Sequence, residues 1–496
     1  MVKLCDATLS EVAEKVAIPT YDRSQLRVGI AHFGVGNFHR THQAAFIDRI
    51  LHVEGNERWG IVGIGLSAGV ESEKKATNFR QQDCLYTLTE FDSDGSAQSR
   101  VIGAMMGYLH APSDPEGVLD LLSDPELRIV TLTITEGGYE VDERTGKFRV
   151  DRPHIQADLN SELPKNVFGY IVRALARRRA AGIAPFTVVS CDNLRQNGNT
   201  VRKAILGYAT AWDSELTEWI DENLSCPNSM VDRIAPYVAD EDRARLNEMT
   251  GVDDVIPVMS ESYLQWVMED NFPAGRPKLE SVGVELRSDV ETYETVKVRM
   301  LNATHILMSY PALLLGYRYV HDAMRDPRIV DLLETFLDVD VIPHLHGPEG
   351  VSLDEYKDLI LNRFSNPAIG DQLIRIATDG ASKIPVFHAK TIANQIETGM
   401  DVRRGALLFA CYAHYLGGFD DGGARIDVTE PTLDPTDRTL ADDRGSSGLL
   451  TIPTFAGLGL ADSPEFVAEY LQFREQIASE GVASALESAI VVRERR

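Results

Sequence analysis

The amino-acid sequence predicts an α/β protein in which a doubly wound parallel sheet domain, residues 1–287, precedes a mainly α-helical domain, residues 288–496. Two observations predict this organisation. In the first half, apolar segments of strand length alternate with helical patterns, which is typical of a parallel sheet covered by helices. Beyond about Tyr293, long helical periodicities replace the strand candidates. The chain of 496 residues is long enough for two large domains with separate cores.

The first expected element is a short buried strand over residues 27–33, a mostly apolar run that follows a polar leader. A glycine turn, Gly34-Val35-Gly36, comes next and opens a helical pattern from Asn37 to about His52. A second apolar strand, Trp59–Gly65, and a polar helix through Arg80 follow. The chain therefore begins with a strand, helix, strand and helix in alternation.

Two later strands extend the predicted sheet. Leu127–Thr135 and Phe186–Cys191 are continuous runs of apolar or β-branched residues, as expected for parallel strands that are covered on both faces. A helical pattern around Val167–Ala181 lies between them and would supply part of that cover.

The second half is predicted to be helical, with clear periodicities over Val296–Met308, Ile329–Phe336 and Ser463–Ser479. Residues 417–448 are dense in Asp, Gly, Thr and Pro. This composition indicates a solvated excursion or flap rather than a separate domain.

The composition is that of an ordinary globular protein and excludes several function classes. Acidic residues number 75 and basic residues 49, so the formal net charge is −26, and a field of that sign repels nucleic acids and anionic membranes. Five widely spaced cysteines without a CxxC pattern fit a reducing compartment. No signal peptide or membrane span is recognised. We expect a cytoplasmic protein with a small-molecule substrate; its oligomeric state is open, and a monomer is compatible with the sequence.

The glycine turn predicts a dinucleotide site of the Rossmann type. Glycines let the backbone approach a pyrophosphate, whose charge is met by amide donors and by the positive end of the following helix. The pattern here is Gly34-x-Gly36-x-x-His39, so the third small residue is missing. A simple tight turn is the alternative interpretation.

An acidic residue after the second strand would accept both adenosine ribose hydroxyls and reject a 2′-phosphate. Glu71 is the candidate, with Glu73 nearby. Lys74, Lys75 and Arg80 could instead receive a phosphate. The alternative to both is a solvated helix start with acids near its positive end.

The most informative polar pattern lies on one predicted helix. Measured from Lys297 at about 100° per residue, three further polar residues fall near 60°, 80° and 140°: Glu294, His305 and Asn302. From Lys297 to His305 the helix rises roughly 12 Å, so this row of side chains could hold several hydroxyls of a sugar-sized ligand. The alternative is a solvated polar stripe with His305 hydrogen-bonded in the core.

Three other positions are candidates for chemistry or metal binding. Asn193 ends a predicted parallel strand, where residues face the ligand crevice of an open sheet, so its amide is a candidate donor. Asp232 lies beside Arg233, where an internal salt bridge or a turn cap is the simpler explanation. His344 and His346 have no identified third ligand, so no metal site is predicted.

Five motifs follow one another nearly from end to end of the chain: Gly29–Arg40, Thr133–Tyr139, Ser190–Leu194, Pro227–Ile234 and Lys297-x4-Asn302-x2-His305. Together they resemble the polyol-specific long-chain dehydrogenases, and most closely the mannitol 2-dehydrogenase branch. The resemblance implies a reversible, metal-free, NAD(P)-dependent oxidation of a sugar alcohol to its ketose. D-mannitol and D-fructose are the first expectation for the substrate pair, and NAD is expected rather than NADP.

The resemblance also implies roles for individual residues. Lys297 would be the general acid/base, and Asn193 and Asn302 would hold the developing alkoxide. Family substrate-site positions are matched by His305, Asp232, Arg375 and Lys383. Acids associated with the proton or water path of the site are matched by Glu136 and Glu294. Cofactor contacts are expected at Gly34, Gly36, Asn37, Phe38, Glu71 and Thr135.

Two departures from the family pattern bear on these expectations. Cys226 stands where the family signature usually has Phe, which we interpret as a packing change. The segment after Leu66 carries about two extra residues beside the cofactor-selecting acid, so the choice between NAD and NADP stays open. Uronate reductases of the family tend to carry a DGSQKLP-like run, whereas residues 379–385 with Arg375 upstream look more like the mannitol branch. A polyol therefore ranks above a uronate.

The chemistry explains why these residue types are needed. A secondary alcohol donates hydride more readily once its hydroxyl proton leaves, so a base must lie at that oxygen. The pKa of an unperturbed lysine is about 10.4, so we expect burial or nearby cations to lower the pKa of Lys297. Two amides can stabilise the alkoxide without a charge that would trap it.

Three rival functions are kept. A hexuronate reductase would use Arg375 and Lys383 to bind the substrate carboxylate. A non-catalytic nucleotide or sugar sensor could share the fold, although the joint presence of Lys297, Asn193 and Asn302 argues against it. A methyltransferase could use the glycine turn but would not need the polar face around Lys297.

Overall fold

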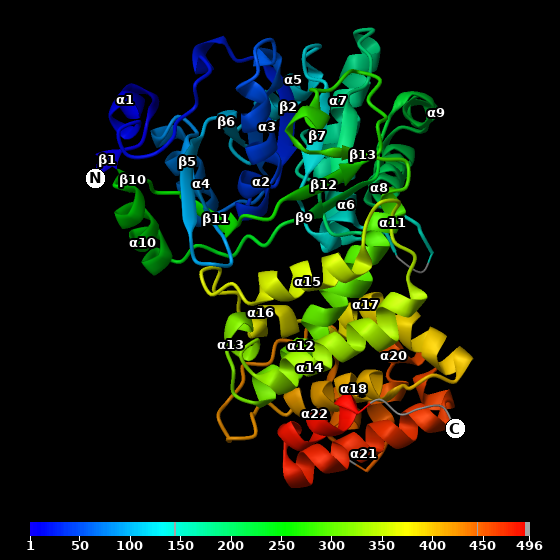
Figure 1. Ribbon diagram of the computed structural model, residues 1–496. Coiled ribbons are helices and arrows are strands. Elements are labelled where there is room, and N and C mark those ends of the chain that lie inside the picture. The colour runs from blue at the N-terminus through cyan, green and yellow to red at the C-terminus, as the bar shows by residue number, and fades with distance from the viewer. Residues whose placement is uncertain (143–144, 444, 492–496) are drawn as a thin grey trace. The chain divides into compact units, whose positions relative to one another are not determined.

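The computed structural model describes residues 1–142, 145–443 and 445–491, and the chain divides into two compact units. Unit 1 consists of residues 1–92 and 96–291, and unit 2 consists of residues 93–95 and the chain from Thr292 onward. In Figure 1 the colours of unit 1 run from blue to green and those of unit 2 from green to red. Each unit is described separately below.

Unit 1 is built on a five-stranded parallel sheet in the order β6-β3-β2-β7-β8. Its strands are β2 (Val28–Phe33), β3 (Gly60–Gly65), β6 (Met105–His110), β7 (Ile129–Leu132) and β8 (Thr187–Ser190). The chain adds β3 and β6 on one side of β2 and then crosses to β7 and β8 on the other. The order therefore reverses between β2 and β7, which is where open α/β sheets bind ligands. The predicted doubly wound parallel sheet is confirmed.

Helices cover both faces of this sheet. Ile30 packs in one apolar cluster with α3 (Gln43–Leu51) and α4 (Val70–Gln81). Its neighbour Ala31 packs in another with α5 (Pro115–Ser123), α7 (Val167–Ala180) and α8 (Asn197–Trp212). Successive residues of a strand point to opposite faces, so two buried faces require the continuous apolar runs seen in the sequence.

The first predicted helix, residues 37–52, is interrupted. It forms α2 (Asn37–Thr41) and α3, which are separated at His42, whose backbone has φ −107° and ψ −85°. The His42 ring is buried and its Nε2 lies 2.8 Å from the carbonyl oxygen of Gln265. This contact connects the interruption between α2 and α3 to Gln265, which is far away in the sequence.

Unit 1 also contains smaller sheets, whose strands were not predicted from the sequence. One contains β4 (Tyr86–Phe91), β5 (Ala97–Ile102) and β11 (Val258–Glu261). Another contains β9 (Ser229–Asp232), β12 (Gln265–Met268) and β13 (Glu285–Leu286). A two-stranded sheet pairs β1 (Val2–Lys3) with β10 (Val252–Asp253).

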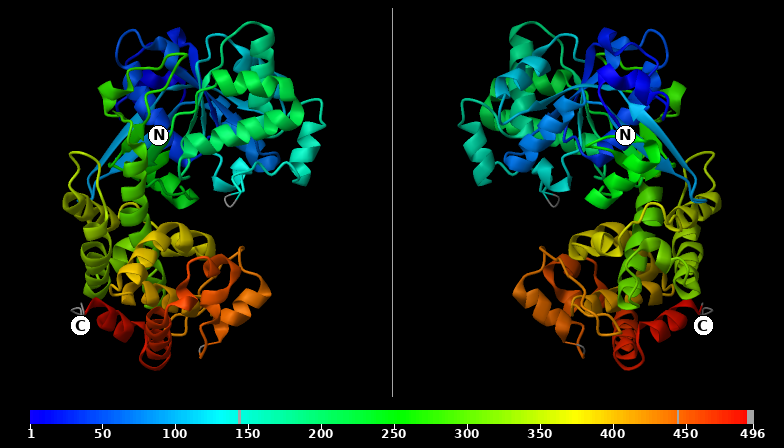
Figure 2. Two further views of the ribbon diagram at one scale, coloured as in Figure 1. Left: turned by 90° about the vertical axis from the view of Figure 1, so that its right-hand side faces the viewer. Right: turned by 90° about the vertical axis from the view of Figure 1, so that its left-hand side faces the viewer.

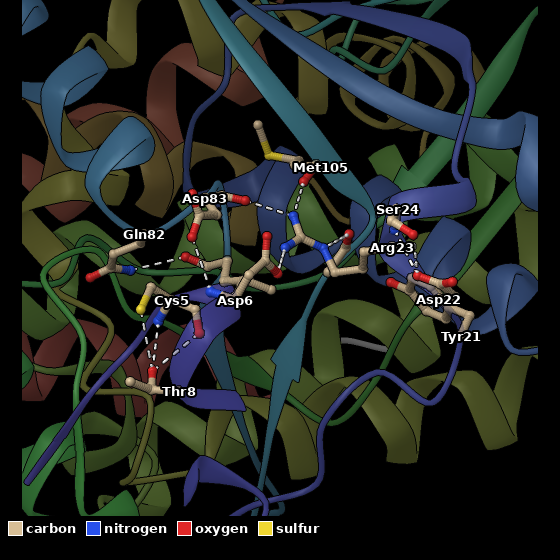
Figure 3. Close-up of polar contacts among 12 residues, drawn as sticks. Cys5, Asp6, Thr8, Tyr21, Asp22, Arg23, Ser24, Gln82, Asp83 and Met105 are labelled. Atoms are coloured by element: carbon tan, nitrogen blue, oxygen red, sulfur yellow. Dashed lines mark hydrogen bonds and ion pairs between the residues drawn. The ribbon is translucent and has the colours of Figure 1, made fainter. Parts of the chain in front are cut away.

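The polar leader is fixed to unit 1 by Arg23 (Figure 3). Its guanidinium donates to the carbonyl oxygens of Gly103 (3.1 Å), Met105 (2.9 Å) and Asp83 (2.6 Å) and forms an ion pair with Asp6. A cavity of about 920 Å³ lies beside it, between the leader and the β6 edge of the sheet. Among the described residues, none of the predicted site residues lines this cavity.

Unit 2 is helical, as predicted (Figure 2). Its core helix is α18 (Arg403–Tyr415), which packs against α12 (Ala303–Leu314), α21 (Pro464–Glu480) and α22 (Val482–Ile490) around one apolar cluster. The remaining helices are α13 (Val320–Ala323), α14 (Pro327–Thr335), α15 (Leu353–Phe364), α16 (Leu373–Ala377), α17 (Gly380–Thr398), α19 (Pro435–Asp442) and α20 (Pro453–Ala456). No β-strand is present in the described part of this unit.

Residues 417–448 differ from the predicted solvated excursion. They contain α19, and the side chains of Ile426 and Leu433 join the apolar cluster of unit 2. Glu430 is buried, and its carboxylate accepts hydrogen bonds from the amides of Gly380 (2.7 Å) and Ala381 (3.3 Å) at the start of α17. The burial of Glu430 could not be predicted from the polar composition, because a carboxylate that caps a helix is not marked by apolar residues in the sequence.

Across the described ranges, no helix combines the length and apolar character that crossing a bilayer would require.

Candidate active site

The glycine turn follows β2 at the point where the strand order reverses. Gly34 has φ +91°, and a Cβ there would lie 1.9 Å from the carbonyl oxygen of Thr133, so only glycine fits. At Gly36 the nearest atom to an added Cβ is the carbonyl oxygen of Gly34, 3.8 Å away. Open space therefore borders the backbone at this second glycine. The turn fits a ligand that approaches the main chain closely, as the phosphates of a dinucleotide do.

The missing third glycine is replaced by a buried ring stack. The rings of His39 and His32 lie 3.5 Å apart at an interplanar angle of 11°, and Nδ1 of His39 is hydrogen-bonded to Oε1 of Gln43 at 2.9 Å. Burial lowers the pKa of His32 to about 3 and that of His39 well below its usual range. Two neutral rings can stack without repulsion, so α2 packs closely on β2 without a glycine.

Asn37 and Phe38 begin α2 directly after the turn. In the side-chain amide of Asn37, Nδ2 donates to the carbonyl oxygen of Pro236 (2.9 Å) and Oδ1 accepts from the guanidinium of Arg40 (2.7 Å). The ring of Phe38 stacks on His42 at 4.9 Å. These contacts fix the conformation of the turn, and the cofactor contacts predicted for both residues stay predictions.

Lys75 is the cation that reaches the glycine turn. Its ammonium group donates to the carbonyl oxygen of Val35, and burial lowers its pKa to about 8, with a further contribution from Arg40. Glu71 lies in the first turn of α4 and is exposed. The sequence offered Lys75 only as one of three cations that could receive a phosphate. The structure singles it out because its ammonium group, unlike that of the exposed Lys74, reaches the carbonyl oxygen of Val35.

Replacement of Lys75 by methionine is expected to weaken binding of the dinucleotide about tenfold and to change turnover little. A charge-assisted hydrogen bond to a phosphate would be lost, while the groups that act on the alcohol remain. Titration of NADH fluorescence and the KM for the cofactor measure the effect. Lys74→Met, on the neighbouring exposed side chain, is the matched control. Equal affinities for the two variants would contradict a role for Lys75 in binding phosphate.

Asp192 organises the edge of the sheet beside the switch in strand order, and sequence reasoning missed it. Its carboxylate accepts hydrogen bonds from the amides of Ile134 (2.9 Å) and Thr135 (3.1 Å) and from the hydroxyl of Tyr139 (2.7 Å). Thr135 has φ +64° and ψ 161°, a conformation that is unfavourable for a β-branched residue. The half-buried carboxylate of Asp192 thus holds the loop after β7 in a strained conformation.

Three predicted site residues, Asn193, Thr135 and Glu136, lie at this edge. Asn193 directly follows Asp192 after the end of β8, and Glu136 directly follows Thr135 after β7; both are exposed. Because β7 and β8 are parallel neighbours, their carboxyl ends meet at the same edge. The structure therefore brings the neighbourhoods of Asn193, Thr135 and Glu136 together, and Asp192 connects them.

Asp232 lies outside the five-stranded sheet, at the end of β9, and is 3% exposed. The next residue, Arg233, has a fully buried side chain that forms an ion pair with Glu90 and donates to the carbonyl oxygens of Thr41 and Glu261. These contacts hold the end of β9 against α2. The charge of Arg233 is met by Glu90.

The helix that carries Lys297 is not a continuous α-helix. Between α11 (Val290–Val296) and α12, residues Lys297–Asn302 form η6, a π-helix. The α-helical geometry assumed from the sequence is therefore wrong over these six residues. In a π-helix each hydrogen bond reaches one residue further, and short π segments are frequent at functional sites.

The π segment changes which side chains share a face. A π-helix advances by about 80° per residue, so Asn302, five residues after Lys297, lies near 40° instead of the predicted 140°. Three α-helical residues later His305 lies near −20°, and Glu294 stays near 60°. All four side chains therefore fall within about 80° of helix surface. Lys297 is 7% and His305 9% exposed, and the His305 ring stacks on Phe364 at 3.9 Å.

Arg375 and Lys383 lie on the two consecutive helices α16 and α17. The ammonium group of Lys383 donates to the carbonyl oxygen of Ile376 at 3.1 Å. The guanidinium of Arg375 binds both carboxylate oxygens of Asp371 at 2.7 Å, and its side chain is 58% exposed. Because Asp371 already balances this charge, Arg375 is poorly prepared to hold a substrate carboxylate.

Within the described ranges, no three side chains of His, Cys, Asp or Glu gather in a group that could hold a metal ion.

Comparisons with known proteins agree with the fold and with the predicted resemblance. The mannitol dehydrogenase Rossmann domain matches residues 28–281, and the mannitol dehydrogenase C-terminal domain matches residues 289–478. A polyol:NADP oxidoreductase of Gluconobacter oxydans is 47% identical over 97% of this chain and 99% of its own length.

Two solved structures are similar over almost the whole chain. One is D-sorbitol dehydrogenase in substrate-free form, 45% identical, with a TM-score of 0.89 over 98% of this chain and 100% of that chain. The other is the Pseudomonas fluorescens mannitol 2-dehydrogenase in a ternary complex with NAD and D-mannitol, 41% identical, with a TM-score of 0.90 over 98% of this chain and 99% of that chain. The chain therefore belongs to the mannitol dehydrogenase family and is an NAD(P)-dependent polyol dehydrogenase.

Proposed function

We propose that the protein interconverts D-mannitol and D-fructose with NAD, and that Lys297 is the general acid/base. The observation that carries the proposal is the π segment, which gathers Lys297, Asn302, His305 and Glu294 on one helix face. A buried amine and an amide on one face are the groups that oxidation of a secondary alcohol needs. The alternative interpretation, a solvated polar stripe with His305 in the core, does not fit Lys297, which is only 7% exposed.

The mechanism assigns one task to each group. When bound, the nicotinamide supplies the hydride acceptor. Lys297 takes the proton from the alcohol oxygen during oxidation and returns it during reduction of the ketose. Asn193 and Asn302 donate hydrogen bonds to the oxygen while it carries negative charge, and neither amide adds a charge that would hold the alkoxide in place.

Further residues bind the rest of the substrate or move protons. We assign hydroxyl contacts to His305, Asp232, Arg375 and Lys383, and the proton or water path to Glu136 and Glu294. The stack on Phe364 fixes the plane of the His305 ring, which sets the direction of its nitrogens. Asp192 contributes by holding the loop that precedes Glu136.

NAD is proposed as the preferred cofactor on the position of Glu71. Its exposed carboxylate in the first turn of α4 can accept ribose hydroxyls and repel a 2′-phosphate. The relative in Gluconobacter oxydans is named for NADP, and the mannitol 2-dehydrogenase structure contains NAD. Rates with both cofactors, for the wild type and Glu71→Ser, test the choice: Glu71→Ser is expected to gain activity with NADP. A wild type that prefers NADP would overturn the assignment.

The substrate is tested by initial rates with D-fructose and D-fructuronate at the same NADH concentration. We expect faster turnover per KM with D-fructose, because the guanidinium of Arg375 is already bound to Asp371. A preference for D-fructuronate would identify a hexuronate reductase. Reduction of neither ketose, together with binding of NADH, would favour a sensor or another polyol, which a wider screen with D-xylulose and tagaturonate would distinguish.

A further inference from the structure

Arg299 places a buried positive charge two residues after Lys297, in the same π segment. It is 5% exposed. Its guanidinium donates to Oγ1 of Thr391 (3.3 and 3.2 Å) and to the carbonyl oxygen of His344 (3.1 Å). Within the described residues no carboxylate forms an ion pair with it. A guanidinium that is buried among neutral acceptors is costly, which raises the question of what its charge does.

The charged groups on the elements around η6 do not balance Arg299. On α17 they are Lys383, His388, Lys390 and Glu397. Burial lowers the pKa of His388 to about 4, so its ring is neutral, and Lys390 and Glu397 are both exposed. The neutral ring donates from Nε2 to the carbonyl oxygen of Ala303 at 3.0 Å. The flanking helices α11 and α12 carry Glu294 and His305, on the face that Lys297 shares. Glu291, also on α11, is exposed and forms an ion pair with Arg195.

A second π segment, η7 (Phe336–Val341), packs against η6 and carries two acids. Asp338 forms an ion pair with Lys357 at 2.7 Å, and Asp340 forms a fully buried one with Arg404 at 2.5 Å. Both acids on this element are therefore engaged by other cations. The charge of Arg299 acts on its surroundings largely uncompensated.

We propose that Arg299 is a positioning residue that acts on Lys297 through its charge, favouring the uncharged amine that takes the proton from the alcohol. The inference rests on the proposed role of Lys297 and adds the source of its tuning. Because Arg299 is two residues after Lys297, their α-carbons lie less than about 7.6 Å apart. Across a partly buried distance of about 10 Å, a unit charge shifts a neighbouring titration by about one pH unit. The contacts with Thr391 and His344 hold the guanidinium behind the helix, away from the face of Lys297.

The pH profile of polyol oxidation, measured as kcat/KM with NAD, tests the inference. Arg299→Met removes the charge and is expected to move the alkaline midpoint of the profile upward by about one unit. Arg299→Lys keeps the charge and is expected to keep the midpoint near that of the wild type. Thr391→Val removes the hydrogen-bond acceptor and leaves the charge. It is expected to leave the midpoint unchanged. A midpoint that is the same in Arg299→Met and in the wild type would overturn the proposal.

A second pair of variants, both at Thr391, tests the effect of the charge while Arg299 is kept, in case Arg299→Met does not fold. Thr391→Asp places a carboxylate beside the guanidinium and is expected to raise the midpoint, whereas the neutral control Thr391→Asn is not. Equal midpoints for this pair would also overturn the proposal. Failure of the proposed role of Lys297 can be distinguished from failure of the inference about Arg299. In the first case Lys297→Ala would keep its turnover, whatever the Arg299 and Thr391 variants show.

Discussion

Lys297→Ala is expected to lower turnover about 10³-fold and to leave binding of NADH unchanged. The substitution removes the group that is proposed to carry the proton of the alcohol, and proton transfer by a positioned side chain contributes factors of this size. Lys297 is far from the glycine turn in the sequence and belongs to unit 2, whereas the turn belongs to unit 1. Single-turnover rates measure the chemical step, and fluorescence titration measures the binding of NADH.

Lys390→Ala is the matched control, because Lys390 is an exposed lysine on α17. It should retain the rate of the wild type. In the wild type, oxidation is expected to accelerate as the pH rises and ketose reduction to slow, since one group acts as base forwards and as acid backwards. Near-normal turnover of Lys297→Ala, or flat profiles in both directions with chemistry rate-limiting, would refute the assigned role.

Asn302→Ala is expected to lower kcat about 10²-fold with a smaller change in KM. Its amide is proposed to donate to an oxygen that becomes negatively charged only as the reaction proceeds, so its loss is felt more in the transition state than in the bound substrate. Asn193→Ala should show an effect of similar size. The double variant is expected to lose less than the product of the two factors, because both amides are proposed to serve one oxygen.

Asn160→Ala, at an exposed position after α6 (Pro153–Leu159), controls for the loss of an asparagine and should leave kcat unchanged. Asn302→Asp sharpens the test, since a carboxylate of similar shape would repel the developing negative charge and lower kcat further than alanine does. If either Asn302 variant raised KM and spared kcat, the amide would bind the ground state, and its assignment to the alkoxide would be wrong.

Four of the five strands of the main sheet could be predicted from the sequence because they are buried on both faces, whereas the edge strand β6 was not predicted. Apolar runs mark β2, β3, β7 and β8 without reference to the rest of the chain. The strands of the smaller sheets carry no such mark. β4 pairs with β11, some 170 residues later, and strands of two to four residues such as β1 and β13 are too short for any periodicity to show.

The candidate site was predictable in its residue types and less so in its geometry. Lys297, Asn302 and His305 could be found from their spacing, but the π turn between them could not. Residues far away in the sequence contact that turn: on α17, His388 donates to the carbonyl oxygen of Ala303, and Thr391 accepts from Arg299. Asp192 escaped notice for a related reason: its role appears only once the loop after β7 folds against it.

The π segment also restricts how the chain can change in length. Five π-helical steps of about 80° and four α-helical steps of about 100° both turn the chain by about 400°, so a protein with one residue fewer between 297 and 302 could form an uninterrupted α-helix here without turning the residues that follow. His305 would then keep its direction relative to Lys297. Loss of a second residue would turn His305 by about 100° and shift it by about 1.5 Å, although every polar residue would still be present. Homologous enzymes that share this chemistry should therefore tolerate exchanges of the apolar residues in the segment and the loss of one residue, whereas longer deletions within it should be absent.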